Sequence, residues 1–505
     1  MTRPPTAPRA WWHASKRASA RQLARRLAPS LGLVASPAVH MERAYLDTVD
    51  WRLFRRGEVL IEECDPTDSR ALVLQARASQ RSDLVVRTSS RPRTADDLPG
   101  GLRTRLRPVL AARPLIDVGH ERVEVWPLRM LDADGKTVAH IDVERIERSD
   151  AAPTVRVQLR SVRGYERVAS QLRHALDRQA DLVAAADPMV LAVRAAGAEP
   201  GVTRGPPRLQ LDGAARGLET LAAVLQHQLD TLVAHEDGVR RQLDPELLHD
   251  FRIAVRRTRS VVRLARPLLP VDVATVWATE WKWLATVTST PRDLDVLLEE
   301  IEGARPSLPA DTKVGIDEIR ELIIERRTAA QHVLESALAG DRYATLKRGW
   351  QAGLSNLANR EDSTAASVAA NDVAARAMKQ VVRRATSIDA ESPAETVHDV
   401  RRRTKRLRYV LELFGPILPA RSMKAQLRAT KRLQDDLGAF QDNEVHRALI
   451  TELLSSPGAS PTARSTGREL VTRFEARSAA ARTELPQQLE RFLTDVSGAE
   501  RQPRQ

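Results

Sequence analysis

The chain has very little cysteine and no long apolar run. Among 505 residues there is one cysteine, Cys64, which excludes disulfide frameworks and thiolate metal sites within a monomer. No apolar stretch approaches the roughly 18–20 residues that span a bilayer. The basic N-terminal segment lacks the apolar core of a secretory signal. We therefore expect a cytoplasmic protein without a membrane span.

Aromatic residues are also scarce, at 4% of the chain. Proteins that grip single-stranded nucleic acid combine a basic groove with aromatic platforms on which bases stack. No helix-turn-helix, zinc-finger or ribonucleoprotein pattern is present either. We therefore expect no specific nucleic-acid partner.

Positive charge, by contrast, is abundant. The net charge is +13 and the isoelectric point is about 10.4. Such a balance favours association with polyanions, and guanidinium groups hold phosphate oxygens in a two-pronged fork. A GC-rich coding bias would raise the total number of arginines, but it would not determine where they lie.

The first part of the chain has strand patterns. Residues 1–38 are predicted to be a basic tail, and residues 39–185 a β domain closed by a helix over Tyr165–Ala184. Short runs with alternating polarity predict an antiparallel sheet or barrel. These runs are Val59–Glu62, Ala71–Ala76, Leu84–Arg87, Val123–Leu128, Val138–Val143 and Val155–Leu159.

A linker rich in proline and glycine, residues 186–213, precedes a helical region over 214–500. Apolar residues recur there every three or four positions, which predicts the helices of a bundle. The predicted helices are Gly217–His235, Glu246–Arg266, Thr275–Thr288, Lys313–Ala339, Ser367–Thr386, Pro393–Phe414, Met423–Gly438 and Asp442–Leu454. The fold class is multidomain α+β: an antiparallel, barrel-like domain followed by an all-α, pseudo-two-fold bundle with repeats at about 214–340 and 365–495.

One motif occurs twice in the helical region, 149 residues apart. His249 and His398 are each followed by cations at +3, +7, +8 and +10, by a lysine at +33 and by an aspartate at +44. In the first copy the cations are Arg252, Arg256, Arg257, Arg259 and Lys282, with Arg263 continuing the row. In the second they are Arg401, Lys405, Arg406, Arg408 and Lys431, with Lys424 and Arg428 extending it.

On each helix the histidine and the cations at +3, +7 and +10 form one stripe opposite an apolar face. Arg257 and Arg406 flank the stripe, and Lys282 and Lys431 begin a second matched element. Like charges at such spacings destabilise a helix by a few tenths of a kcal/mol per pair, and a bound anion would offset that loss. A solvated face is the alternative for one copy, but it does not account for two copies in matching phase. The histidines could cap or pack, or donate to phosphate. Asp293 and Asp442 could cap a helix, orient a stripe arginine or hold a divalent metal.

With these residues the region resembles the two halves of a CHAD domain, the conserved histidine α-helical domain. The resemblance implies a basic groove or pore that binds inorganic polyphosphate, and an association with polyphosphate granules. By this resemblance the twelve motif residues from His249 to Lys431 would contact phosphate, and polyphosphate-metabolising enzymes or granule proteins would be partners. It implies no catalytic residue, no cofactor and no metal in this domain.

The first domain resembles a degenerate CYTH domain, a β-tunnel that binds triphosphates with divalent metal. Glu42–Thr48, Asp50–Gly57 and His140–Glu144 carry the likeness. The opening Glu-x-Glu-x-Lys strand of that family is missing, and a late strand that should alternate acids has Arg156, Gln158 and Arg160 instead. Metal-assisted hydrolysis needs carboxylates, so we expect little or no catalysis.

The sequence leaves three candidate functions. The first is non-catalytic polyphosphate binding by the helical bundle. The second is a metal-dependent triphosphate or polyphosphate hydrolase, for which Glu62, Asp142 and Glu144 are the remaining acids. The third is an adaptor for nucleic acid or acidic membranes.

Overall fold

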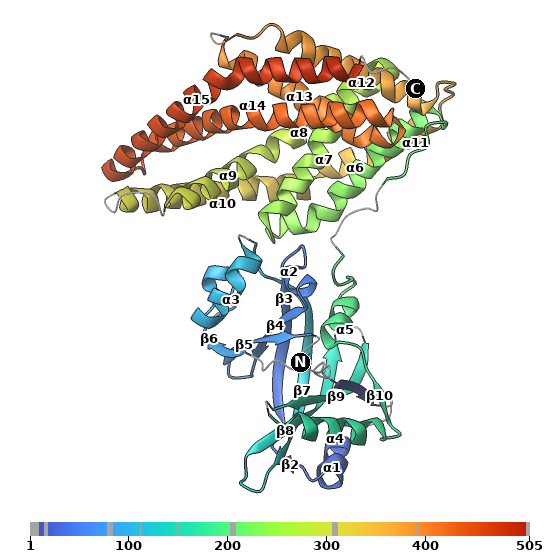
Figure 1. The fold of residues 1–505 in the computed structure, drawn as a ribbon, viewed down its shortest axis with the longest axis vertical. Helices are drawn as coiled ribbons and strands as arrows, with labels where there is room; N and C mark the ends of the chain where they lie inside the picture. The colour runs from blue at the N-terminus through green and yellow to red at the C-terminus, as the bar shows by residue number, and fades with distance from the viewer. Residues whose placement is uncertain are drawn as a thin grey trace. The chain divides into compact units, whose positions relative to one another are not determined.

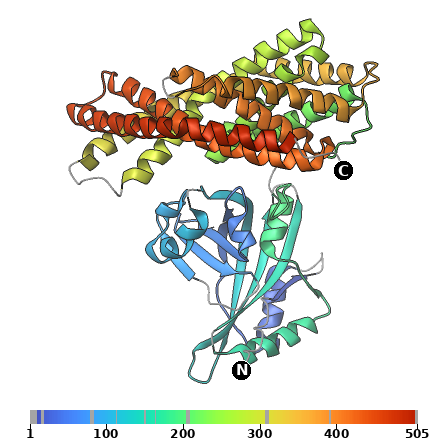
Figure 2. The same ribbon diagram turned by 45° about the horizontal axis from the view of Figure 1, so that its top comes forward.

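The computed structural model describes the chain except residues 1–9, 15–18, 78–83, 112, 149–150, 163, 203–208, 306–311, 390–391 and 501–505. It divides into two compact units, Met1–Arg204 and Gly205–Gln505. The division falls inside the segment predicted as a linker. Figures 1 and 2 show a sheet-containing first unit and a helical second unit, which confirms the α+β architecture.

The first unit is built on one antiparallel sheet of ten strands in the order β10-β1-β9-β8-β7-β3-β4-β5-β6, with β2 beside β7. Its strands are β1 (Ala10–Ala14), β2 (Val34–Ala35), β3 (Val39–Asp47), β4 (Glu58–Cys64), β5 (Arg70–Ala76), β6 (Leu84–Thr88), β7 (Ile116–Leu131), β8 (Thr137–Arg148), β9 (Ala151–Ser161) and β10 (Leu182–Ala184). All six predicted strand runs lie in strands. The Asp134-Gly135 turn joins β7 to β8, and Gly135 takes the positive φ that such a turn requires.

Helices cover this sheet: α1 (Ala20–Ser30), α2 (Arg52–Arg55), η1 (Ala95–Asp97), α3 (Gly100–Leu110), α4 (Glu166–Asp177) and α5 (Pro188–Ala195). The helix predicted over Tyr165–Ala184 is shorter than expected, because the chain leaves α4 at Asp177 and adds β10 to the sheet edge. The linker prediction also missed α5, whose first turn is capped by the Asp187 carboxylate accepting from the Met189 N–H.

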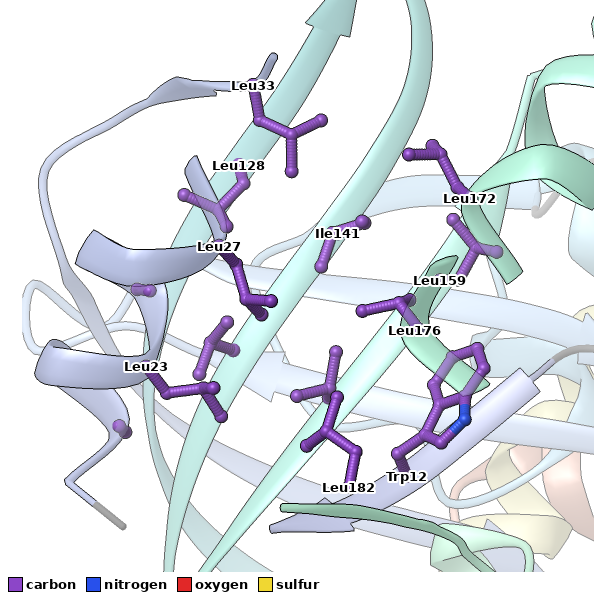
Figure 3. Close-up of a cluster of buried hydrophobic side chains, with 14 of the residues drawn as sticks. Trp12, Leu23, Leu27, Leu33, Leu128, Ile141, Leu159, Leu172, Leu176 and Leu182 are labelled. Atoms are coloured by element: carbon purple, nitrogen blue, oxygen red, sulfur yellow. The ribbon is translucent and has the colours of Figure 1, made fainter. Parts of the chain in front are cut away.

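The predicted basic tail is wrong for residues 10–14 and 19–35, which belong to the sheet unit. Strand β1 pairs with β9 and β10, and Leu23 and Leu27 of α1 are buried in one cluster with Leu128 and Ile141 of the sheet (Figure 3). The arginines of α1 lie on its exposed side. They raise the mean polarity of the segment, which hid the apolar i, i+4 spacing that docks the helix.

The second unit is all helical. Its elements are α6 (Gly217–Arg240), α7 (Pro245–Leu264), η2 (Arg266–Leu268), α8 (Val271–Val287), α9 (Ser289–Ala304), α10 (Thr312–Ala339), α11 (Asp341–Ala358), α12 (Ala366–Ala385), α13 (Ala394–Phe414), η4 (Gly415–Ile417), α14 (Ala420–Leu454) and α15 (Pro461–Glu500). The prediction missed α9, α11 and α15. It also split α14, which runs through the predicted break at 439–441 as one helix.

The 149-residue spacing holds for the helix starts as well as for the motif. Helices α6, α7, α8 and α10 begin 149 residues before α12, α13, α14 and α15 respectively, and η2 precedes η4 by the same number. The second copy fuses what the first copy divides, since α14 matches α8 with α9 and α15 matches α10 with α11. Figures 1 and 2 show α14 and α15 side by side along their length.

The two copies meet through a reciprocal backbone contact. The Gly217 N–H donates to the Thr364 carbonyl, and the Ala366 N–H donates to the Ala215 carbonyl. These donors and acceptors are themselves 149 residues apart, so the contact lies on the pseudo-two-fold axis. The ends of α9–α10 and α14–α15 share an apolar core that includes Leu297, Ile319 and Phe474.

Candidate anion-binding site

A groove of about 760 Å³ in the helical unit collects cations from both copies of the motif. It is lined by α7, α8 and α13. Its charged residues are Arg256, Arg259, Arg263, Arg266, Lys282, Arg402, Lys405 and Arg406. No aspartate or glutamate is among the described residues that line it. The lining is therefore strongly positive, although Arg402 pairs with Asp399, outside the lining, at 3.2 Å.

The groove forms because α7 and α13 turn their apolar faces inward. Phe251 and Val255 on α7, and Val400 and Leu407 on α13, are fully buried. Since cations occupy the remaining arc of each helix, burying the apolar face directs both stripes toward the same space. The groove brings part of the two stripes together: Arg256, Arg259 and Arg263 of the first meet Lys405 of the second and the flanking Arg406.

The electrostatics of the groove reflect crowding of like charge. Burial, together with the charges of Arg401 and Arg256, lowers the pKa of Lys405 to about 7. Burial and the Arg263 guanidinium lower the pKa of Arg406 to about 10. Burial and neighbouring cations both destabilise the charged forms of Lys405 and Arg406 when no anion is near. A bound anion would stabilise these charged forms.

Two stripe arginines are held by the matched aspartates. Arg252 Nη2 lies 3.6 Å from Asp293, and Arg401 Nη2 lies 2.8 Å from Asp442. Each pair spans 41 residues, so the contact is repeated in both copies. The expectation that these aspartates orient stripe arginines is confirmed. Within the described ranges no cluster of three or more His, Cys, Asp or Glu side chains could hold a metal ion.

Three predicted cations gather instead around Glu412. The Glu412 carboxylate accepts from Arg257 at 2.8 Å and from Arg408 at 2.7 Å, and Lys431 Nζ lies 4.0 Å away. Burial raises the pKa of Glu412, but hydrogen bonds from the two arginines outweigh it and lower the pKa overall. The carboxylate is therefore ionised, and its single negative charge compensates these three cations in part.

The other predicted contacts lie outside the groove lining. His249 and His398 are half-buried in the first turns of α7 and α13, and each has partners of its own. Lys424 and Arg428 are exposed on α14. Phosphate contact by these residues stays a prediction.

The lining residues that sequence reasoning missed include Arg266, Arg402, Trp277 and Trp281. Arg402 lies about 40° from His398 on a helical projection, so the stripe pattern contained it. Arg266 follows the helix end, and its place depends on the η2 turn. The tryptophans are at most 6% exposed and pack on Trp350, so they form the floor of the groove.

The first unit has a different kind of pocket. A cavity of about 290 Å³ is lined by residues from β1, β3 to β9 and α5, so the sheet curls around it. Among its charged lining residues, Arg43, Arg77 and Arg160 pair with Glu63, Asp187 and Asp142 respectively. Valines, Ile61 and Met189 supply much of the wall. The pocket is therefore balanced in charge.

The three acids that remain for a metal-dependent hydrolase, Glu62, Asp142 and Glu144, are each paired with arginine. Glu144 is buried between Arg43 at 3.1 Å and Arg156 at 2.7 Å, and although burial opposes it, these guanidinium groups lower its pKa to about 2. Asp142 pairs with Arg160 at 2.6 Å.

Glu62 likewise accepts from Arg70 and Arg91. The register of β8 and β9 sets Glu144 opposite Arg156 and Asp142 opposite Gln158. A divalent metal would have to displace these arginines to reach the carboxylates.

Comparisons with known proteins agree with this geometry. Residues 223–451 match the family model of the CHAD domain. The CHAD domain of the plant Ricinus communis is 27% identical, with a TM-score of 0.50, over 58% of this chain and 96% of that one. A search of the curated proteins gave no match. The part of the chain that the structure describes contains no helix able to cross a membrane.

Two further structures are more distant. PptA from Streptomyces chartreusis is 17% identical over 55% of this chain and all of that one, with a TM-score of 0.44. A putative adenylyl cyclase from Hippeastrum with a dominant triphosphatase activity is 12% identical over 38% of this chain and 95% of its own, with a TM-score of 0.30. The match to the CHAD domain model spans both copies of the motif and the paired starts of α7 and α13 and of α8 and α14.

Proposed function

We propose that this protein binds inorganic polyphosphate through the groove between α7, α8 and α13. The observation that carries the proposal is a lining of eight cations without a carboxylate among its described residues. A linear polyanion with one charge on each repeating unit would neutralise such a row along its length. Arginine is suited to this ligand because its fork matches two phosphate oxygens.

The groove favours a polymer without bases over nucleic acid. Base stacking needs exposed aromatic faces, whereas Trp277, Trp281 and Tyr409 are nearly buried. The ligand would therefore contact guanidinium and ammonium groups rather than rings. Where polyphosphate is concentrated in granules, the protein would associate with them, and polyphosphate enzymes or granule proteins would be its neighbours.

The hydrolase alternative has less support. Its three remaining acids are engaged by arginines in the first unit. Phosphate release would require breaking those pairs before a metal could bind.

The proposal is tested by titrating labelled long-chain polyphosphate into the full-length protein at several salt concentrations. Affinity should fall steeply as salt rises, because bound cations displace counterions from the polymer. Charge reversal of Arg259, Arg263 and Arg406 to glutamate should weaken binding by about 100-fold or more.

A matched control reverses Arg348, Arg464 and Arg468, which are exposed on α11 and α15. This triple variant has the same net charge and should keep most of the affinity. If both triples weaken binding equally, the protein attracts polyphosphate by net charge alone and the groove is not the site. Single-stranded DNA that competes equally at the same phosphate concentration would favour the adaptor function instead.

A further inference from the structure

The duplication predicts a second groove on the other side of the α7–α13 pair. Each residue of the first groove has a counterpart 149 residues away in the other copy. The counterparts of Arg259 and Lys282 are Arg408 and Lys431, and the counterpart of Arg406 is Arg257. The structure brings these three counterparts together, since all lie at Glu412. The same spacing relates Thr275 and Thr279, which line the first groove, to Lys424 and Arg428.

One position breaks this correspondence in sign. The counterpart of Arg263 is Glu412. Arg263 is exposed in the first groove, whereas Glu412 is partly buried and accepts hydrogen bonds from two of the cations that would otherwise face a ligand. A carboxylate with two guanidinium partners and an ammonium group nearby makes the contacts that a phosphate group would make.

We propose that Arg257, Arg408, Lys424, Arg428 and Lys431 form a second phosphate-binding groove, which the Glu412 carboxylate keeps closed by acting as an internal substitute for phosphate. The inference rests on the proposed function. It assigns the polymer to the first groove in the natural protein. It also explains why the cations on α14 are numerous although the lining of the first groove does not include them.

The ionisation of Glu412 keeps the second groove closed over the physiological pH range. Its pKa is lowered by the Arg408 and Arg257 hydrogen bonds, against the effect of burial. A phosphate group must therefore displace a charged and doubly hydrogen-bonded carboxylate. The first groove presents no such competitor among its lining residues.

A charge swap in the full-length protein tests this assignment. Arg263→Glu should place a carboxylate in the first groove and weaken polyphosphate binding by about tenfold or more. Glu412→Arg should open the second groove, tightening binding and raising the number of phosphates bound per protein at saturation. The double variant Arg263→Glu/Glu412→Arg has the charge of the natural protein, and it should recover most of the affinity lost in Arg263→Glu.

Two further variants serve as a second test and as a control. Glu412→Gln removes the carboxylate without adding a fourth cation, so it opens the groove even if Glu412→Arg fails to fold, and it should also raise saturation. Glu475→Arg has the same charge change as Glu412→Arg on an exposed site of α15. Phe474, next to Glu475 in the chain, contacts His446 of α14. His446 follows Lys431 by fifteen residues, which is about 20 Å along that helix. The control therefore lies at a distance of this order from the second groove.

The outcomes separate the two proposals. If the natural protein binds polyphosphate but the double variant is as weak as Arg263→Glu, and Glu412→Gln leaves saturation unchanged, the second groove does not exist. If Glu475→Arg tightens binding as much as Glu412→Arg, the gain comes from net charge, and the inference is overturned. If the natural protein does not bind polyphosphate at all, the proposed function fails first.

Discussion

The two pockets of this protein treat buried arginine in opposite ways. In the sheet unit, Arg156 is fully buried between Glu144 and Glu121, and its pKa is raised because both carboxylates favour the charged form. In the helical groove, burial and neighbouring cations lower the pKa of Arg406. The first environment stabilises the charge from within the fold, and the second leaves the charge to be stabilised by a ligand.

This difference separates arginines that are paired within the fold from arginines that we propose bind a ligand. Both units are rich in arginine, so composition alone does not distinguish them. What distinguishes them is the presence of an acid on the facing strand or helix. A pocket whose cations are paired with acids attracts an anion weakly. A pocket whose cations lack such partners attracts an anion strongly, but the repulsion between its cations lowers the stability of the fold.

The largest expected effect is on the stability of the sheet unit. Glu144→Ala would leave Arg43 and Arg156 buried without their shared partner, so we expect the unfolding free energy of this unit to fall by about 3–5 kcal/mol. Denaturant titration and hydrogen exchange of β7–β9 would measure it. Glu147→Ala on the same strand removes an exposed pair with Arg145 and should cost about 0–1 kcal/mol. Equal losses in the two variants would contradict the comparison.

The next effect is a pH dependence of polyphosphate binding. Lys405 has a pKa of about 7 in the empty groove, where it faces Arg401, Arg256, Arg252 and Asp442. A bound polyanion would raise this pKa, so binding takes up a proton above pH 7. Affinity should therefore fall by up to about tenfold for each pH unit between 7 and 9. In Lys405→Arg the cation stays protonated, and the profile should be flatter; an unchanged profile would exclude Lys405 as its origin.

A smaller effect concerns the stability of the empty groove. Because the folded-state pKa of Lys405 lies below the value of an unfolded chain, its charge destabilises the fold at low pH. That loss disappears as pH rises through 7 toward about 10. Lys405→Met should thus raise stability by on the order of 1 kcal/mol at pH 6, after allowance for solvent screening, and by less at pH 10. Thermal unfolding at both pH values measures the difference. A gain of the same size at pH 10 would point to packing instead.

The smallest expected effect is on phosphate chemistry in the sheet unit. Glu62 is held by Arg70 and Arg91. Glu62→Gln should leave polyphosphate affinity within about twofold, because this acid takes no part in the groove. Tripolyphosphate with Mn²⁺ should release phosphate at the same background rate with the natural protein and with this variant. Release that depends on Glu62 would restore the hydrolase alternative.

The sequence predicted which cations belong to the helical region's repeated motif better than it predicted which of them line the groove. Because a duplicated pattern carries phase as well as composition, the 149-residue spacing identified the cations of both stripes and the two matched aspartates, but not which arginine each aspartate contacts. It did not separate Arg406, which lines the groove, from Arg257 and Arg408, which contact Glu412. Those outcomes depend on which side of the helix pair each residue faces, and that is fixed only when α7 packs on α13.

The errors at the chain's beginning have a different cause. Basic side chains dominate the local composition around Leu23 and Leu27, so the segment read as a solvated tail. Its docking depends on a sheet edge whose strands come from more than a hundred residues later. Short-range patterns do not report such pairing.

The reciprocal hydrogen bonds at Gly217 and Ala366 have a consequence for how the groove responds to its ligand. They tie together the starts of α6 and α12, the helices that precede the two stripe helices, by main-chain contacts alone. These contacts oppose any separation of the repeats that repulsion between the arginines would favour. Under the proposed function, a polymer would therefore meet two repeats that are already joined at their helix starts.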